Sequence, residues 1–273
     1  MTQKQIKSHT KDLNHAYNKL VLDYPMGSYI PSWKIFRAFA KENKIIADHV
    51  CSTEAWNKTG LSTIMDIGSG DGLVLKNILE QYKSEIKVKF VEPNEELVND
   101  AQSHLFNFKQ IEYIAKELFK LDFEKEFKNV DLFLVIHVLY LLEEKSLSKL
   151  IDQIPKDKPI IVVTDDCNSL FSDCWNITGH KYAYRSNKIH DEIENLKSTG
   201  LIKLKKTSFK TYLKNPFNVD RPDLKESLLS MVTYSEFSKL SDNSKIEISK
   251  IFDKYSEGEL VECNSACYEI VKI

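Results

Sequence analysis

The stretch MDIGSGDG, residues 65–72, can bring bare polypeptide backbone against a ligand. Gly68 and Gly70 permit positive φ angles and carry no side-chain bulk, so backbone N–H groups and the start of the following helix can contact the ligand directly. Glu92 stands twenty residues beyond this loop, where its carboxylate can accept two hydrogen bonds from a ribose diol. The spacing therefore predicts a site for a ligand that contains a nucleoside.

Two carboxylates in the same loop limit which nucleoside fits. Asp66 and Asp71 flank the glycines; they would repel a pyrophosphate and attract a sulfonium or an amino group. Leu73 takes the place of the third glycine in the hydride-carrier pattern G-x-G-x-x-G, and the phosphate-loop pattern G-x-x-x-x-G-K-S/T is absent. These features favour S-adenosylmethionine, which has ribose hydroxyls, a positive centre and no phosphate. We expect Asp66 and the glycines to hold its methionine part and Glu92 its ribose.

Residues suited to the acceptor side follow two later strands. His137 stands at the end of the fourth predicted strand, and its ordinary pKa near 6.5 suits a base or a hydrogen-bond acceptor; a buried histidine bonded to backbone is the alternative. Asp165 follows the fifth strand and could attract a cationic amine. Its neighbour Asp166, or Asn168, could instead cap the next helix.

Buried strands alternate with helical segments between residues 61 and 166, which is typical of crossover units in a parallel sheet. Apart from Asp131 and His137, the segment 130–139 is apolar, as a strand covered on both faces should be. Asn94 is a good N-cap for the helix after the second strand. The predicted strands are 61–67, 86–93, 110–115, 130–139 and 158–166, followed by 201–213 and 259–273.

Helical segments precede and interrupt the predicted sheet. The first sixty residues have helical spacing except near Pro25, Gly27 and Pro31, which break a helix. Tyr17 and Tyr24, beside this break, could close over the cofactor.

A single α/β domain is predicted over residues 1–273, with a Rossmann-like, seven-stranded, mostly parallel sheet and helices on both faces. One helical run is expected over residues 33–50. The expected parts are a helical N-terminal cover (1–58), a cofactor-binding core (59–213), a helical insert (214–258) and the final strand (259–273).

Composition argues against several classes of partner. Lys and Arg number 38 against 40 Asp and Glu, giving a formal net charge of -2, so no global positive field attracts nucleic acid or an anionic membrane. The longest apolar run is too short to span a bilayer, and the N-terminus lacks a signal-peptide core. The five cysteines form no CxxC pair, which suits a reducing cytosol and argues against a metal site. We expect a cytoplasmic protein that binds a small molecule but no nucleic acid, membrane or metal; its oligomeric state is open.

The motifs MDIGSGDG, FVEP and VDLFLVIHVL together resemble those of class I S-adenosylmethionine-dependent methyltransferases. The resemblance extends from about residue 60 to 165 and includes the C-terminal strand. It implies that Glu117 and Leu118, after the third strand, lie where such enzymes hold the adenine; an exposed helix-start glutamate is the alternative for Glu117. The implied cofactor site consists of Asp66, Gly68, Ser69, Gly70, Glu92, Pro93, Glu117, Leu118 and Ile136.

Within that superfamily, VEPNEELV, IHVLYLLEE, IIVVTDDCNSLFSDCWNITG and NSACYEIVKI resemble histamine N-methyltransferase and its relatives. His137 takes the place of a family glutamine that contacts the substrate, and the family's N-terminal glutamate has no counterpart, which argues against histamine itself as the acceptor. The resemblance implies substrate contacts from Tyr140, Trp175 and Asn264 beside Asp165 and a catalytic His137. The two aromatic residues could equally be core, and Asn264 could face solvent.

The sequence thus predicts methyl transfer from S-adenosylmethionine to a small molecule, most simply at an amine nitrogen. The alternatives are O-methylation of a small carboxylate or phenol, and a protein that binds the cofactor or a partner without turnover. Enzymes that methylate exocyclic base amines usually carry D/N/S-P-P-Y/F/W after the fourth strand, where this chain reads VIHVLY.

Overall fold

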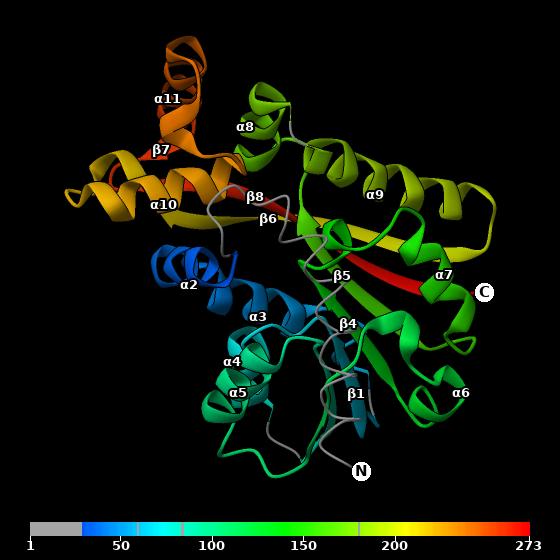
Figure 1. Ribbon diagram of the computed structural model, residues 1–273. Coiled ribbons are helices and arrows are strands. Elements are labelled where there is room, and N and C mark those ends of the chain that lie inside the picture. The colour runs from blue at the N-terminus through cyan, green and yellow to red at the C-terminus, as the bar shows by residue number, and fades with distance from the viewer. Residues whose placement is uncertain (1–28, 59, 83–84, 180) are drawn as a thin grey trace, which may run out of the picture.

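A mixed sheet runs through the part of the chain that the structure, a computed structural model, describes: residues 29–58, 60–82, 85–179 and 181–273 (Figure 1). Its strands are β1 (Thr63–Ile67), β2 (Lys87–Val91), β3 (Ile111–Ile114), β4 (Leu132–Ile136), β5 (Pro159–Asp165), β6 (Ile202–Lys214), β7 (Ser256–Glu257) and β8 (Leu260–Lys272). They lie in the order β3-β2-β1-β4-β5-β8-β6, with β7 paired to β8. Every predicted strand is therefore present, and the short β7 is added to the predicted seven.

The strand order reverses between β1 and β4. Pairs from β3 to β5 are parallel, whereas β8 runs antiparallel to β5, β6 and β7. In such a sheet the crevice beyond the carboxyl ends at the reversal is where ligands bind. The loop after β1 and the ends of β2, β4 and β5 meet at this place.

Helices cover both faces of the central strands, which explains why β4 is apolar throughout. Along β4, Leu132 and Leu134 pack toward one face, while Phe133 and Val135 pack toward the other. Figure 1 shows the two helical layers, which are α3 (Glu42–Ser52), α4 (Leu73–Gln81) and α5 (Glu95–His104) on the first face and α6 (Phe123–Glu126), α7 (Ser146–Gln153) and α9 (Lys181–Ser198) on the second.

A third apolar cluster lies among helices from both ends of the sequence. Phe36 from the N-terminal side packs in the same cluster as Trp175, Leu228 and Phe252. The helices of this cluster are α2 (Tyr29–Phe39), α8 (Leu170–Thr178), α10 (Pro222–Thr233) and α11 (Asp242–Tyr255). The short 3-10 segments are η1 (Leu118–Lys120), η2 (Leu139–Leu141), η3 (Pro216–Asn218) and η4 (Phe237–Lys239).

The helical run expected over residues 33–50 is two helices. The chain turns between α2 and α3, where Ala40 forms an isolated antiparallel bridge with Leu213 of β6. Pro31 was predicted to break a helix, but it lies in the first turn of α2. A proline is tolerated there because the first N–H groups of a helix have no intrahelical partner.

Helix capping agrees with the sequence in one place and differs in another. Asn94 caps α5, its side chain accepting a backbone N–H at 3.0 Å, as predicted. The cap of α8 is Ser169 rather than Asp166 or Asn168. Asp166 instead accepts hydrogen bonds from Ser208 Oγ at 2.7 Å and from the following backbone N–H.

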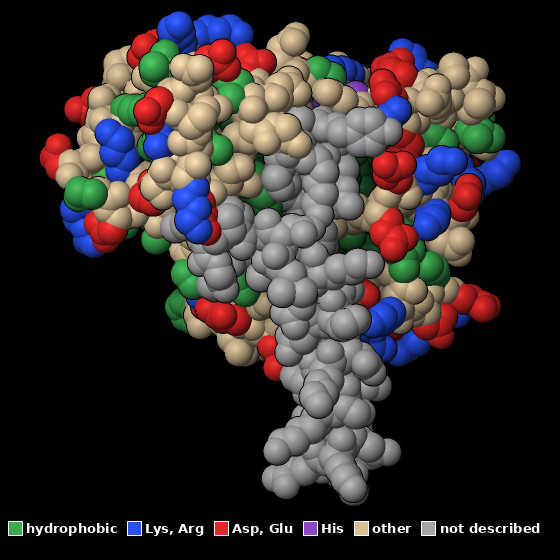
Figure 2. Space-filling view, turned by 45° about the horizontal axis from the view of Figure 1, so that its top comes forward, with side chains coloured by type: hydrophobic (Ala, Val, Ile, Leu, Met, Phe, Trp, Pro, Cys, Tyr) green, Lys and Arg blue, Asp and Glu red, His purple; other side chains and the backbone are tan. Residues whose placement is uncertain are grey.

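Tyr17, Tyr24, Pro25 and Gly27 lie outside the described residues. Within the described ranges, none of the helices has the length and apolar character that crossing a bilayer requires. Acidic and basic side chains are intermixed over the described part of the face seen in Figure 2, consistent with the nearly balanced composition.

The glycines of the loop after β1 are required for two different reasons. Gly68 has φ +71°, and a Cβ there would lie 2.4 Å from Cγ2 of Val138, so the backbone of the loop packs directly on that side chain. Gly70 has φ +58°, while a Cβ there would meet only Trp33, at an ordinary 3.5 Å. The approach at Gly68 is therefore to the chain's own valine, and at Gly70 the backbone conformation alone favours glycine.

Replacing Gly68 with alanine should destabilise the fold more than the same change at Gly200. Gly200 has φ +72° with nothing within 4 Å of a Cβ, so its substitution costs only the left-handed conformation, about 1–2 kcal/mol. Gly68→Ala adds overpacking against Val138, about 1–3 kcal/mol more. Urea unfolding of the two variants measures this difference; equal losses would show that the loop does not pack on Val138 as described.

Candidate functional site

A cavity of about 780 Å³ opens at the carboxyl ends of the parallel strands, beneath α2. It reaches from the glycine loop to the aromatic side chains of α8 and α10. Of the predicted site residues that the structure describes, all except Asn264 line it. These are Asp66, Gly68, Ser69, Gly70, Glu92, Pro93, Glu117, Leu118, Ile136, His137, Tyr140, Asp165 and Trp175.

Glu92 joins the end of β2 to the glycine loop. Its side chain is buried, and its carboxylate accepts the N–H of Gly70 at 3.1 Å and the N–H of Asn94 at 3.0 Å. Burial raises the pKa of Glu92 to about 7, against the lowering effect of the two backbone hydrogen bonds. Each carboxylate oxygen retains lone-pair capacity, so Glu92 can shape the loop and still accept ribose hydroxyls.

Asp66 forms the floor of the loop. It is only 4% exposed, and the hydroxyl of Ser69 donates to its backbone carbonyl at 2.7 Å. Burial raises the pKa of the Asp66 carboxyl to about 7, with Ser69 opposing the shift and the negative charge of Glu92 adding to it. A cationic group in the cavity would favour ionisation of both carboxyls.

The loop after β3 closes one end of the cavity. Leu118 is buried, Phe119 is 41% exposed at the surface, and Glu117 forms an ion pair with Lys120 at 3.1 Å. Together with Pro93, these residues give this part of the cavity an apolar lining with a polar rim. Its character suits the flat adenine ring that these residues were predicted to hold.

Helix α2 supplies a wall that the sequence reasoning missed. Trp33, Phe36 and Arg37 line the cavity, and Arg37 forms ion pairs with Glu42 at 2.7 Å and with Asp71 of the glycine loop at 3.4 Å. The sequence signal was present as one arginine within the apolar run WKIFRAF. Helical spacing alone explained that run as core packing, which is why its function was not predicted.

His137 and Asp165 meet at the other end. His137 Nδ1 lies 3.9 Å from Asp165 Oδ1, and its buried Nε2 has no hydrogen-bond partner among the described residues. The backbone of His137 has φ +51°, unusual for a residue with a side chain, and its N–H donates to the carbonyl of Val163 at 2.8 Å. The turn after β4 therefore directs this imidazole toward the cavity. The alternative, a buried histidine whose ring is hydrogen-bonded to backbone, does not describe this arrangement.

Asp165 is a buried carboxyl with an altered titration. It is 6% exposed, and burial raises its pKa to about 6, although the positive charge available on His137 lowers it and the charge of Glu42 raises it. The group can therefore change protonation state near neutral pH.

Aromatic side chains surround this acidic end. Tyr140 lies 6.4 Å from His137 and 6.3 Å from Trp175, measured between ring centroids. Trp175 also packs edge-on against Tyr234 and contacts Phe171. Tyr140 and Trp175 thus take part in the packing around α8 and also line the cavity. The sequence had left core packing and a place in the substrate site as alternatives.

Asn264 lies outside the cavity. Its side-chain amide donates to the carbonyl of Asn168 at 3.0 Å, bracing the turn between β5 and α8 from β8. Its predicted contact with the substrate finds no support in this placement.

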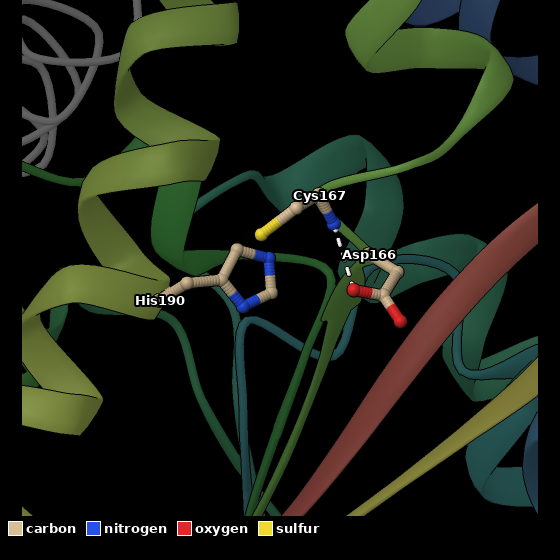
Figure 3. Close-up of side chains that lie close together, drawn as sticks. All are labelled: Asp166, Cys167 and His190. Atoms are coloured by element: carbon tan, nitrogen blue, oxygen red, sulfur yellow. Dashed lines mark hydrogen bonds between the residues drawn. The ribbon is translucent and has the colours of Figure 1, made fainter.

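A second titratable cluster lies just behind Asp165, where Asp166, Cys167 and His190 converge (Figure 3). Both ring nitrogens of His190 have partners: Nε2 donates to the carbonyl of Asp165 at 2.9 Å, and Nδ1 accepts from the hydroxyl of Tyr268. These bonds, with those of Asp166 to Ser208 and Lys206, tie the end of β5 to α9, β8 and β6.

Residues 64–156 match the family model described as a methyltransferase domain. The chain carries a class I S-adenosylmethionine-dependent methyltransferase domain. S-adenosylmethionine is accordingly its cofactor, as the glycine loop and Glu92 predicted. A comparison with curated proteins found no match.

Solved structures share the fold of this methyltransferase domain. The plantazolicin methyltransferase BpumL in complex with SAH (S-adenosylhomocysteine) has a TM-score of 0.51 and 14% identity, covering 97% of this chain and 100% of that one. BamL, in complex with a triazolic desmethylPZN analog and SAH, has a TM-score of 0.51 and 12% identity, covering 96% and 98%. The YcgJ protein from Bacillus subtilis has a TM-score of 0.53 and 11% identity, covering 85% and 98%. At these identities the likeness establishes the fold, and the resemblance to histamine N-methyltransferase stays a prediction.

Affinity for S-adenosylhomocysteine should rise with pH up to about 7 and then level off. Glu92 has its pKa raised to about 7 in the free protein, and hydroxyls that donate to it favour the ionised form, so binding below pH 7 releases a proton. One linked proton corresponds to about a tenfold change per pH unit.

Calorimetry between pH 5.5 and 8.5 measures this dependence. Glu92→Gln should weaken binding and reduce the slope, while Asp66→Asn reports the share of the second buried carboxyl. A slope unaltered in both variants would contradict this account of the two carboxyls.

Proposed function

We propose that the chain methylates a nitrogen of a small amine, which enters the cavity as an ammonium ion. The observation that carries this proposal is the His137–Asp165 pair at the ends of β4 and β5, which β2 and β1 separate from the loop after β3 in the sheet. A base with a buried, unpartnered nitrogen beside a carboxylate is what an amine needs in order to enter charged and react neutral.

The two residues divide the work. Bound cofactor supplies a methyl group activated by a sulfonium. The ionised carboxylate of Asp165 attracts the ammonium, and Nε2 of His137 accepts the proton that must leave before the nitrogen lone pair is available. Asp165 then lies 3.9 Å from Nδ1 of His137 and stabilises the imidazolium that forms.

Charge and shape around the pair support a small cationic acceptor. Glu42 adds a second carboxylate whose field reaches Asp165, which disfavours a carboxylate acceptor. The aromatic side chains of Tyr140 and Trp175 line the cavity, and aromatic walls suit a cation or a flat ring. The cavity volume must also accommodate the cofactor, which leaves room for an acceptor of modest size.

Replacing His137 with glutamine should lower kcat by about 10²–10⁴-fold, the contribution typical of general base catalysis, while S-adenosylhomocysteine binds within about twofold of its original affinity. Glutamine keeps a polar side chain of similar reach but cannot take a proton at neutral pH. His49→Gln is the matched control, because His49 stacks on Phe209 and contacts Thr207, away from the cavity.

The assay measures methyl release over a panel of amines, phenols and carboxylates. Transfer only to phenols or carboxylates would show that the acceptor atom is oxygen and would reject the proposed amine. Tight cofactor binding without transfer to any of these classes would indicate a protein without turnover. An amine substrate whose kcat is unaffected by His137→Gln would reject the assigned base.

Activity toward an amine should fall as the pH drops below about 6. The pKa of Asp165 is raised to about 6 by burial, so the carboxylate that attracts the ammonium is lost below this value. In Asp165→Asn the fall of kcat/KM below about pH 6 should disappear, and KM for the amine should rise. A profile identical in both proteins would show that Asp165 does not bind the acceptor.

A further inference from the structure

The methionine end of the cofactor carries both an ammonium and a carboxylate. Asp66 and the glycine loop provide for the positive groups, but the carboxylate requires a cation. Besides His137, the cationic side chains among the described residues that line the cavity are Arg37, Lys116 and Lys149.

Of these cations, Arg37 lies at the glycine loop. One of its terminal nitrogens, Nη2, is 3.4 Å from Oδ1 of Asp71, and its Cζ lies 5.3 Å from the ring centroid of Trp33, the side chain that faces Gly70. The two lysines are placed differently, since Lys116 follows β3 and Lys149 lies over the ring of Phe119. Arg37 is therefore next to the loop that holds the methionine part.

The guanidinium of Arg37 has hydrogen-bonding capacity left over. Nη1 donates to Glu42 at 2.7 Å and Nη2 to Asp71, but Nε is buried and has no partner among the described residues. Buried donors in native proteins are nearly always paired, so one that is not calls for a ligand. The side chain of Arg37 is only 10% exposed and lines the cavity, so a ligand bound in the cavity can reach the guanidinium.

We propose that Arg37 binds the methionyl carboxylate of the cofactor, with Glu42 and Asp71 holding the guanidinium in position. A planar guanidinium matches a carboxylate better than a lysine would, because it offers several N–H groups in a fixed fork. Charge balances as well: Arg37, the ligand ammonium and the sulfonium carry three positive charges, against the three negative charges of Glu42, Asp71 and the ligand carboxylate. The cofactor is thus recognised as a zwitterion between α2 and the glycine loop.

The test compares S-adenosylmethionine with its decarboxylated form, which keeps the sulfonium and the amine and lacks only the carboxylate. Calorimetry on the wild-type protein should show tighter binding of the complete cofactor. In Arg37→Gln its affinity should fall by about 10- to 100-fold, the range for hydrogen bonds between charged groups, while the decarboxylated form binds within about twofold of its wild-type affinity. No acceptor is present, so the result is independent of the proposed amine chemistry.

Lys34→Gln is the matched control on the same helix. Lys34 ties α2 to α5 through Glu96 and Asp100, each at 2.8 Å, and should alter both affinities equally or not at all. If Arg37→Gln weakens both ligands equally, Arg37 only fastens α2, and the proposal is wrong; unaltered affinities overturn it too. Should that variant not fold, Arg37→Lys retains the charge and should still reduce the discrimination between the two ligands.

Discussion

The hydrogen bond from the Gly70 N–H to the buried carboxylate of Glu92 connects the first two parallel strands at their carboxyl ends. It fixes the glycine loop against the end of β2, and the second oxygen of the same carboxylate holds the start of α5 through Asn94. The loop can then pack on Val138 from the turn after β4. Loop, strand end and neighbouring turn therefore form one rigid rim, on which the remainder of the site is built.

The cavity within this rim contains buried carboxyl groups whose ionisation is unfavourable in the absence of a ligand. Asp66, Glu92 and Asp165 are all buried, and burial raises the pKa of each. Carboxyls in this condition gain from any cation that enters, because its charge compensates for the hydration they have lost. The site is consequently preorganised for ligands with positive centres, because its carboxyl groups are already in position before the ligand binds.

Strand positions could be predicted from the sequence because central parallel strands, buried on both faces, are apolar runs bounded by glycine or capping residues, as at β1 and β4. The cofactor end of the site followed, since the glycine loop comes directly after β1 and Glu92 directly after β2, the next strand along the chain. The wall formed by α2 could not be predicted, because the contact of Arg37 with Asp71 joins segments whose relative placement depends on tertiary packing. Asn264 illustrates the converse: alternation along a strand does not reveal whether a polar residue faces a cavity or, as here, a neighbouring turn.

Helix α2 is a wall of the cavity whose apolar side packs in the third cluster and whose polar side forms ion pairs with α5 and the glycine loop. Its tie to α5 runs through Lys34, whose side chain is 41% exposed, whereas the tie to the loop through Arg37 is shielded from solvent. Mobile ions screen exposed pairs far more than shielded ones. Higher ionic strength should therefore weaken the ion pairs of Lys34 with α5 before that of Arg37 with the glycine loop. The rate at which nucleoside ligands exchange should then depend on salt, while the reaction inside the cavity stays largely insensitive to it.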